Sequence, residues 1–226
     1  MSRKKIALIT IGQSPRPEVV ADFIKIWGDS FDIIESGALD NLTVQQIAEL
    51  EPQPGEAELL TKLTDGQVVS VSHQRLLPYV QQAIARAAAQ EADIAIMLCT
   101  GNFDGLETVI PLLQPNRILA GSVAGMIATG VDIVVIVPTA GQVEEARSRW
   151  QERGFNVTHV SVISPFAKQD NVLESLLNDT IIQNSAAIVV DCFGFDVDFK
   201  NVLDRHYHKP IFIPRLLLGQ LLLAAL

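Results

Sequence analysis

Residues 94–103 have the sequence IAIMLCTGNF, and residues 187–195 have the sequence AIVVDCFGF. In both stretches an apolar run typical of a buried strand leads to a cysteine, and Cys99 and Cys192 are the only cysteines of the chain. Glycine and polar or aromatic residues follow each cysteine. Because this arrangement occurs twice, it indicates two similar half-domains with one cysteine loop in each. Two thiols that face a small acid from opposite sides could remove a proton and return one.

Short apolar runs alternate with helical patterns along the chain, which is typical of a parallel-stranded α/β fold. Residues 132–137 (DIVVIV) are continuously apolar, as expected for a strand that is covered on both faces. The pattern predicts strands at residues 5–11, 31–36, 93–98, 131–137, 156–162, 186–191 and 210–213. It predicts helices at residues 15–27, 43–50, 75–90, 142–153, 170–183 and 215–225.

Local signals support parts of this assignment. Thr43 and Gln46 have the spacing of a capping box at the start of one helix, and Pro15 and Pro17 suit the first turn of another. The dipeptide Asp65-Gly66 separates two strand-like runs, so residues 59–72 are predicted to form a β-hairpin with a tight turn.

An internal repeat supports two related halves. The strand predicted at 5–11 ends in Gly12-Gln13, and the strand predicted at 131–137 ends in the sequence PTAGQ; a helical pattern follows each. The segment 37–72, with the hairpin, accounts for the extra length of the first half. We therefore expect an α/β fold of two pseudo-symmetric parallel-sheet half-domains with an active-site cleft between them, and a hairpin inserted in the first.

Composition excludes several classes of protein. The chain has 226 residues, 48% of them hydrophobic, which is ordinary for a globular α/β protein. Its net charge is −9 and its basic residues are scattered, so nucleic acid is not an expected partner. The apolar residues 6–11 are too few for a signal peptide, and residues 216–226 are too few to span a bilayer, which takes about 20. The latter segment is expected to be a last helix, buried in the core or partly in a homodimer interface.

The two cysteines have no metal-type spacing, and with no export signal they indicate a reduced, cytoplasmic protein. None of the four histidines (residues 73, 159, 206 and 208) has metal-ligand spacing, so no metal site is expected. The sequence has no phosphate loop, no dinucleotide-binding glycine motif and no Gly-x-Ser-x-Gly elbow. We therefore expect no cofactor and no membrane association.

The loop after the first predicted strand offers donors to an anion. Ser14 is placed to cap the following helix, whose free amides attract negative charge, and Arg16 could present a fork of donors to a carboxylate. Gln13 precedes them in the same loop. The alternative is an ordinary capped helix with Arg16 in solvent.

Each cysteine precedes a segment where the positive end of a helix could lower the pKa of the thiol. The alternative for each is a small buried apolar residue. Asp191 is next to Cys192, and either orients a neighbouring loop or raises the pKa of the cysteine.

Other loops carry further candidates. Thr139, Gln142 and Ser164 offer neutral donors to a substrate carboxylate, although turn chemistry explains them equally well. Arg215 is a second candidate cation, whose alternative is a snorkelling residue at the start of the last helix.

Five short motifs together make the chain similar to the AroM family: GQSPR at 12–16, PGE at 54–56, CTGNF at 99–103, SPF at 164–166 and DCFGF at 191–195. That family more distantly resembles the aspartate/glutamate/hydantoin racemase superfamily, whose members have two αβ halves with one cysteine from each. The resemblance implies that Cys99 is the cysteine of the first half and Cys192 the cysteine of the second half. The chain departs from the racemases at both cysteine motifs, and the acidic residue common in their first loop is replaced by Gln13-Ser14.

The combined prediction is a cofactor-independent racemase or isomerase with Cys99 and Cys192 as its catalytic residues and a small carboxylate as its ligand. The expected ligand-binding residues are Gln13, Ser14, Arg16, Thr100, Gly101, Asn102, Thr139, Gln142, Ser164, Phe193, Gly194 and Arg215. The alternatives are isomerase or decarboxylase chemistry with one cysteine, and a non-catalytic protein that binds a small anion. The expected domains are residues 1–114 with 214–226, and residues 115–213.

Overall fold

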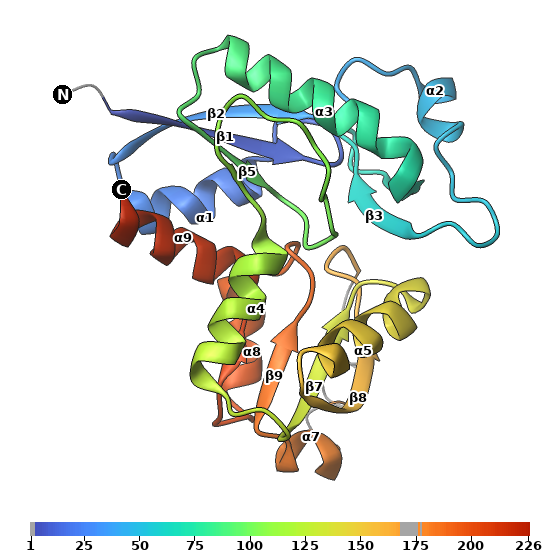
Figure 1. Ribbon diagram of the computed structural model, residues 1–226, viewed down its shortest axis with the longest axis vertical. Coiled ribbons are helices and arrows are strands. Elements are labelled where there is room, and N and C mark those ends of the chain that lie inside the picture. Colours follow the sequence, from blue (N-terminus) through green and yellow to red (C-terminus); the bar gives the residue numbers. More distant parts are fainter. Residues whose placement is uncertain (1–2, 168–175, 177) are drawn as a thin grey trace. The chain divides into compact units, whose positions relative to one another are not determined.

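The computed structural model describes residues 3–167, 176 and 178–226. The chain divides into two compact units, of which the first is Met1–Pro115 with Gly219–Leu226 and the second is Asn116–Leu218. The C-terminal helix α9 (Pro214–Ala225) therefore begins in the second unit and ends in the first, where it lies beside α1 (Pro17–Trp27) (Figure 1). We predicted the return to the first unit at residue 214, whereas the boundary falls at Gly219, inside this helix.

The sheet of the first unit is parallel throughout, in the order β2-β1-β5-β6. Its strands are β1 (Lys4–Thr10), β2 (Phe31–Gly37), β5 (Ile94–Met97) and β6 (Leu112–Leu113). The last five residues of β1 are buried, so helices cover both of its faces, as its unbroken apolar sequence predicts. The other helices of this unit are α2 (Val44–Ala48) and α3 (His73–Ala89). Thr43 and Gln46 form the predicted capping box at α2.

The sheet of the second unit is also parallel, in the order β10-β9-β7-β8. Its strands are β7 (Asp132–Val137), β8 (Asn156–Val162), β9 (Ala187–Val190) and β10 (Ile211–Phe212). The helices that begin in or at the edge of this unit are α4 (Pro115–Met126), the short 3₁₀ turn η1 (Ala140–Gln142), α5 (Val143–Glu152), α7 (Thr180–Asn184) and α8 (Val197–Asp204), followed by α9.

The two sheets have the same topology. In each unit the strands lie side by side in the order second, first, third, fourth, counted along the chain. The register agrees as well, because Ile9 of β1 is opposite Met97 and Ile136 of β7 is opposite Val190. The predicted pseudo-symmetry of the halves is therefore confirmed at the level of strand order and register.

A buried serine also occurs at the equivalent position of both sheets. Ser36 is opposite Ile9, and Ser161 is opposite Ile136, so the two serines occupy equivalent positions. Both are buried, and neither hydroxyl has a hydrogen-bond partner within the part of the chain that the structure describes.

The predicted hairpin is present as β3 (Glu58–Lys62) and β4 (Val68–Ser72), which pair antiparallel (Figure 1). Gly66 closes its turn at φ +91°, a conformation that favours glycine. The hairpin belongs to the first unit, and α3 follows β4 without a break. The hairpin therefore sets the point at which α3 begins.

Within the described residues, β6, α4, α8 and the three-residue turn η1 were not predicted. β6 has only two residues, α4 contains two glycines, and α8 spans only eight residues, so each gives a weak periodic signal. Residues 170–175 and 177 of the helix predicted at 170–183 lie outside the described residues, and α7 covers its end. No helix of the described chain combines the length and the apolar character that a bilayer crossing requires.

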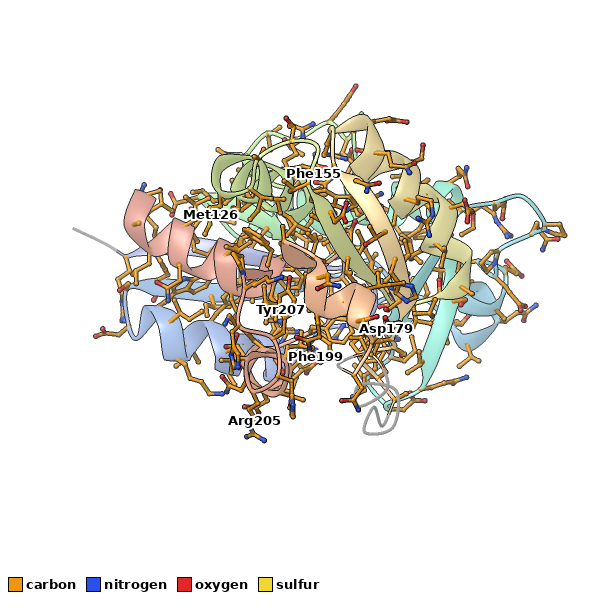
Figure 2. The ribbon with its side chains drawn as sticks, turned by 90° about the horizontal axis from the view of Figure 1, so that it is seen from below. Met126, Phe155, Asp179, Phe199, Arg205 and Tyr207 are labelled. Atoms are coloured by element: carbon orange, nitrogen blue, oxygen red, sulfur yellow. The ribbon has the colours of Figure 1, made fainter. Side chains whose placement is uncertain are left out.

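Tyr207 lies in the core of the second unit with Phe199 (Figure 2). Its hydroxyl donates to the carbonyl of Ser185 at 3.0 Å and also meets the Ser185 hydroxyl at 3.0 Å. Burial raises the pKa of the Tyr207 hydroxyl above its ordinary value, and the hydrogen bond with Ser185 opposes this only partly.

Because the folded chain holds the Tyr207 proton more tightly than the unfolded chain, the free energy of unfolding should decline as the pH rises above about 10. We expect Tyr207→Phe to flatten this decline in urea titrations between pH 8 and 11. Tyr79→Phe, which removes the only other tyrosine, serves as the control and should keep the decline. An equal slope in the wild type and in Tyr207→Phe would show that Tyr207 does not cause it.

Candidate active site

Each sheet has a topological switch point between its first and third strands. After β1 the chain leaves toward β2, and after β5 it leaves toward β6 on the other side; the second sheet repeats this at β7 and β9. In parallel sheets, ligands bind beyond the carboxyl ends of the strands at such points, because the diverging loops leave a crevice. Cys99 follows the end of β5 by two residues, and Cys192 follows the end of β9 by two residues. Both cysteines therefore lie at the switch point of their own unit.

The two cysteines also accept the same kind of hydrogen bond. The Gly101 amide donates to Cys99 Sγ at 3.4 Å, and the Gly194 amide donates to Cys192 Sγ at 3.4 Å. An amide aimed at sulfur interacts more strongly with a thiolate than with a thiol, because hydrogen bonds to an ionised acceptor are stronger. Neither cysteine forms a disulfide, and both are partly exposed.

The prediction that a helix start follows each cysteine is wrong for Cys99. The next helix after Cys99 is α4, which begins only at Pro115. After Cys192, α8 begins at Val197, but the Asp196 carboxylate caps its amides by accepting from Phe199 N at 2.9 Å. The amides that donate to the two sulfurs thus belong to loops.

Arg215 holds the Cys192 loop. Its Nε donates to the Phe193 carbonyl at 3.2 Å and its Nη2 to the Gly194 carbonyl at 3.1 Å. The guanidinium also lies over the Phe193 ring, 5.6 Å from its centroid. Arg215 is only 2% exposed, so it is not a snorkelling residue, and its Nε and Nη2 contact the backbone of the loop.

Asp191 connects the Cys192 loop to α5. Its carboxylate is buried and accepts from Arg149 Nη2 at 2.7 Å and from Trp150 Nε1 at 2.8 Å. Both donors lie on α5, the helix that follows the Thr139 loop at the other side of the switch point. Asp191 thus orients a neighbouring element, which is one of the two roles that the sequence left open for it.

Ser14 does not cap α1. The N-cap position belongs to Arg16, whose side chain makes no capping bond. Ser14 instead donates to Asp40, from its amide to Oδ1 at 2.6 Å and from its hydroxyl to Oδ2 at 2.8 Å. Asp40 also accepts from the Gly37 amide at 2.7 Å. A carboxylate therefore does lie beside the first loop, but it comes from the loop after β2.

Arg16 is likewise engaged with carboxylates of the chain and is not in solvent. Its amide donates to Glu35 at 2.5 Å and its Nε to Glu18 at 2.7 Å. Burial acts to raise the pKa of Glu18, but a hydrogen bond from its own amide and the charge of Arg16 outweigh burial and hold this pKa below its ordinary value. The anions that the first loop attracts are thus Asp40, Glu35 and Glu18.

Gln13 ties the first loop to the hairpin. Its Oε1 accepts from the amide and the hydroxyl of Thr64, each at 3.0 Å. Gly12 packs so closely on β3 that a Cβ at this position would lie 2.4 Å from Thr61 Oγ1. Only glycine fits at Gly12, and the hairpin fixes this loop.

The Cys99 loop has partners that the sequence did not suggest. Thr100 is buried, and the carbonyl of Asn102 accepts a hydrogen bond from His73 Nε2 at 2.6 Å. The Asn102 side chain accepts from the Asp104 amide at 3.1 Å. His73 and Asp40 were both missed because their partners are far away in sequence; the position of His73 directly after the hairpin was the one available signal.

The remaining candidates lie in loops of the second unit. The Thr139 hydroxyl is buried and has no hydrogen-bond partner among the residues described here. Gln142 ends the 3₁₀ turn η1, and the Ser164 hydroxyl accepts from the Phe166 amide at 3.3 Å. Across the described ranges, no three His, Cys, Asp or Glu side chains gather in a way that could hold a metal ion.

Known structures share this fold. Allantoin racemase from Klebsiella pneumoniae is similar with a TM-score of 0.64 at 17% identity, over 98% of this chain and 86% of that chain. A sulfate-associated variant of arylmalonate decarboxylase gives a TM-score of 0.64 at 15% identity, over 97% and 93% of the two chains. The maleate isomerase Iso from Pseudomonas putida S16 gives 0.60 at 10% identity, over 98% and 93%. The fold is thus the racemase-like α/β fold.

Within that fold class, residues 6–225 match the family described as AroM protein, and the chain belongs to the AroM family. No curated protein matches the sequence.

Gly194 allows us to test the geometry of the Cys192 loop. A Cβ there would lie 2.6 Å from Pro165 Cγ and 2.8 Å from Pro165 Cβ, and a proline ring cannot rotate away. We expect Gly194→Ala to lower the free energy of unfolding by about 1–3 kcal/mol, as overpacking does. Gly101→Ala is the matched control, since its Cβ would come no closer than 3.2 Å, to Phe103. Chemical denaturation of both variants measures the difference, and equal losses would contradict the predicted crowding at Gly194.

Proposed function

We propose that this AroM family protein catalyses cofactor-independent proton transfer on a small carboxylic acid, with Cys99 and Cys192 as acid and base. The observation that carries the proposal is the equivalence of the two cysteines. They follow the third strand of matching sheets, and each accepts a hydrogen bond from the amide two residues later at 3.4 Å. A buried structural cysteine would not need this repetition. The similar structures are a racemase, a decarboxylase and an isomerase, and these activities also favour the proposal.

In the proposed reaction, one cysteine is a thiolate and the other a thiol. The thiolate takes the proton from the carbon next to the carboxylate, so that the C–H bond breaks and an S–H bond forms. The thiol then gives its proton to the opposite face of the carbanion, which leaves the roles of the two sulfurs exchanged. Both sulfurs must reach one carbon, in a site that excludes bulk water. The amides of Gly101 and Gly194 stabilise whichever sulfur carries the charge.

Contacts refine which residues would hold the carboxylate. The donors of Ser14 and Arg16 are used by Asp40, Glu35 and Glu18. Thr139 has a hydroxyl without a partner in the described chain, and Thr100 and Asn102 are in the Cys99 loop. We therefore assign the ligand carboxylate to Thr139, and a structural role to the donors of the first loop.

The cellular setting is part of the same proposal. Neither cysteine is in a disulfide, as a reactive thiol in a reducing cytoplasm requires.

The chemistry can be tested by proton NMR in D₂O with a panel of amino, hydroxy and dicarboxylic acids. We expect one compound to lose the signal of a carbon-bound proton in the presence of the wild type. Cys99→Ala and Cys192→Ala should each abolish the loss, and the double variant is the blank. Retained exchange in both single variants would exclude the two-cysteine mechanism.

One difference between the cysteines supports a second candidate, in which only one of them acts. The residue before Cys192 is the buried Asp191, whereas the equivalent residue before Cys99 is Leu98. A buried carboxylate beside Cys192 disfavours a thiolate there, so Cys99 would be the base or nucleophile. In that case the two alanine variants should differ, with exchange or decarboxylation lost only in Cys99→Ala.

The assignment of the carboxylate can be tested with the compound that exchanges. Thr139→Val should weaken its binding about tenfold, the value of one hydrogen bond of about 1.5 kcal/mol to a charged group. Ser14→Ala should change binding less than twofold, because its donors already serve Asp40. Isothermal titration of both variants gives the comparison, and the reverse ranking would return the carboxylate to the first loop.

A further inference from the structure

His73 is the first residue of α3 and touches the Cys99 loop. Two contacts fix the backbone at this point: Ser72 caps the helix, and the His73 amide donates to the Ala57 carbonyl at 2.9 Å. The ring nitrogen Nε2 lies 2.6 Å from the Asn102 carbonyl oxygen. A carbonyl only accepts hydrogen bonds, so Nε2 must carry a proton. The imidazole is therefore either the cation or the neutral tautomer with its proton on Nε2.

The peptide group between Asn102 and Phe103 is held by hydrogen bonds at both its carbonyl and its amide, and His73 binds the carbonyl. The Asn102 carbonyl and the Phe103 amide belong to the same peptide group, and the Phe103 amide donates to Gln114 Oε1 at 3.3 Å. The His73 ring also contacts the buried Phe103 ring, with centroids 5.3 Å apart. A peptide group with both polar atoms bonded to side chains cannot rotate without the loss of both bonds.

The same hairpin-and-helix segment supports the preceding residue as well. Leu59 of β3 packs against Gly101, where an added Cβ would lie 3.4 Å from Leu59 Cδ2. Gly101 is the residue whose amide donates to Cys99 Sγ. The segment from β3 to the start of α3 thus contacts the consecutive residues Gly101, Asn102 and Phe103, directly after the bond to sulfur.

We propose that His73 is a positioning residue for Cys99. Its bond to the Asn102 carbonyl keeps the loop in the conformation in which the Gly101 amide is aimed at the sulfur. Cys99 gains a chemical role only through the proposed function, on which this inference therefore rests. The second unit has a counterpart, because Arg215 holds the Phe193 and Gly194 carbonyls beside Cys192. Both cysteine loops are thus held at backbone carbonyls by a basic side chain from a distant segment.

The rate at which iodoacetamide alkylates Cys99 tests the proposal without any substrate. The parent is the full chain with Cys192→Ser, so that Cys99 is the only thiol, and the rate is followed by intact mass between pH 6 and 9. His73→Leu removes the donor. His73→Gln keeps an amide N–H at the reach of Nε2, and His73→Asn carries one that is too short. His208→Leu, at an exposed position of the second unit, is the control for a lost histidine.

Without the His73 bond, the Gly101 amide is aimed at the sulfur for less of the time, so less thiolate forms at a given pH. We expect His73→Leu and His73→Asn to lower the rate at pH 7 about threefold, equal to a rise of about half a unit in the pH of half-maximal rate. His73→Gln and His208→Leu should match the parent.

Two outcomes would overturn the proposal. One is a pH profile unchanged in both His73→Leu and His73→Asn, even if their melting temperatures fall, because His73 would then only stabilise the fold. The other is a His73→Gln profile as altered as that of His73→Asn, because the hydrogen bond would then not be the cause. If His73→Leu does not fold, His73→Asn and His73→Gln decide. No arm depends on turnover, so absent proton exchange would count against the proposed function and leave this result valid.

Discussion

The backbone pairing of the first strand with the third in each sheet determines where everything else in the unit lies. The Leu98 amide donates to the Ile9 carbonyl at 2.8 Å, and the Asp191 amide donates to the Ile136 carbonyl at 2.8 Å. These are the last ladder bonds before the cysteines. Because the chain then leaves the paired strands in opposite directions, the residues just beyond these bonds are the ones that face the crevice at the switch point.

The loop after β1 and the two cysteine loops differ in what their polar groups contact. The loop after β1 is saturated by the chain's own carboxylates, since Asp40 alone accepts three hydrogen bonds. A loop whose donors are already satisfied is rigid and gains little from an anionic ligand. The cysteine loops are different, because their backbone carbonyls are held by His73 and Arg215 while their amides are directed to sulfur. Asp40, His73 and Arg215 therefore each fix backbone groups of a loop, and in the two cysteine loops an amide donates to sulfur.

Much of the fold could be predicted from the sequence because strands covered on both faces have an unmistakable composition. Residues 6–9 of β1, 133–137 of β7 and 187–190 of β9 are continuously apolar, and the dipeptide Asp65-Gly66 indicates the turn of the hairpin. The strand β6 has no such apolar run, because it consists of two residues and forms by pairing with β5. The repeat of the cysteines was visible for the same reason, because each follows an apolar strand.

The partners of the site could not be predicted in the same way. Asp40 reaches Ser14 across 26 residues, and His73 reaches Asn102 across 29. Local patterns predicted a helix cap for Ser14 and a ligand contact for Arg215, which are the ordinary roles of such residues near helix starts. Tertiary contacts give Ser14 the carboxylate of Asp40 in place of the helix cap, and they bring Arg215 to the carbonyls of Phe193 and Gly194. Local sequence patterns predict neither contact.

The path of α9 has a consequence for how the chain folds as it is synthesised. The second unit is continuous, but the first is complete only when Gly219–Leu226 is present, where the Gly219 carbonyl accepts from Trp27 Nε1 at 2.9 Å. Since chains emerge from the ribosome N-terminus first, the surface of α1 around Phe23 and Trp27 stays uncovered until translation has passed the entire second unit. The half that is made first is therefore the half that is completed last, and during that interval the face of α1 that packs against α9 stays exposed.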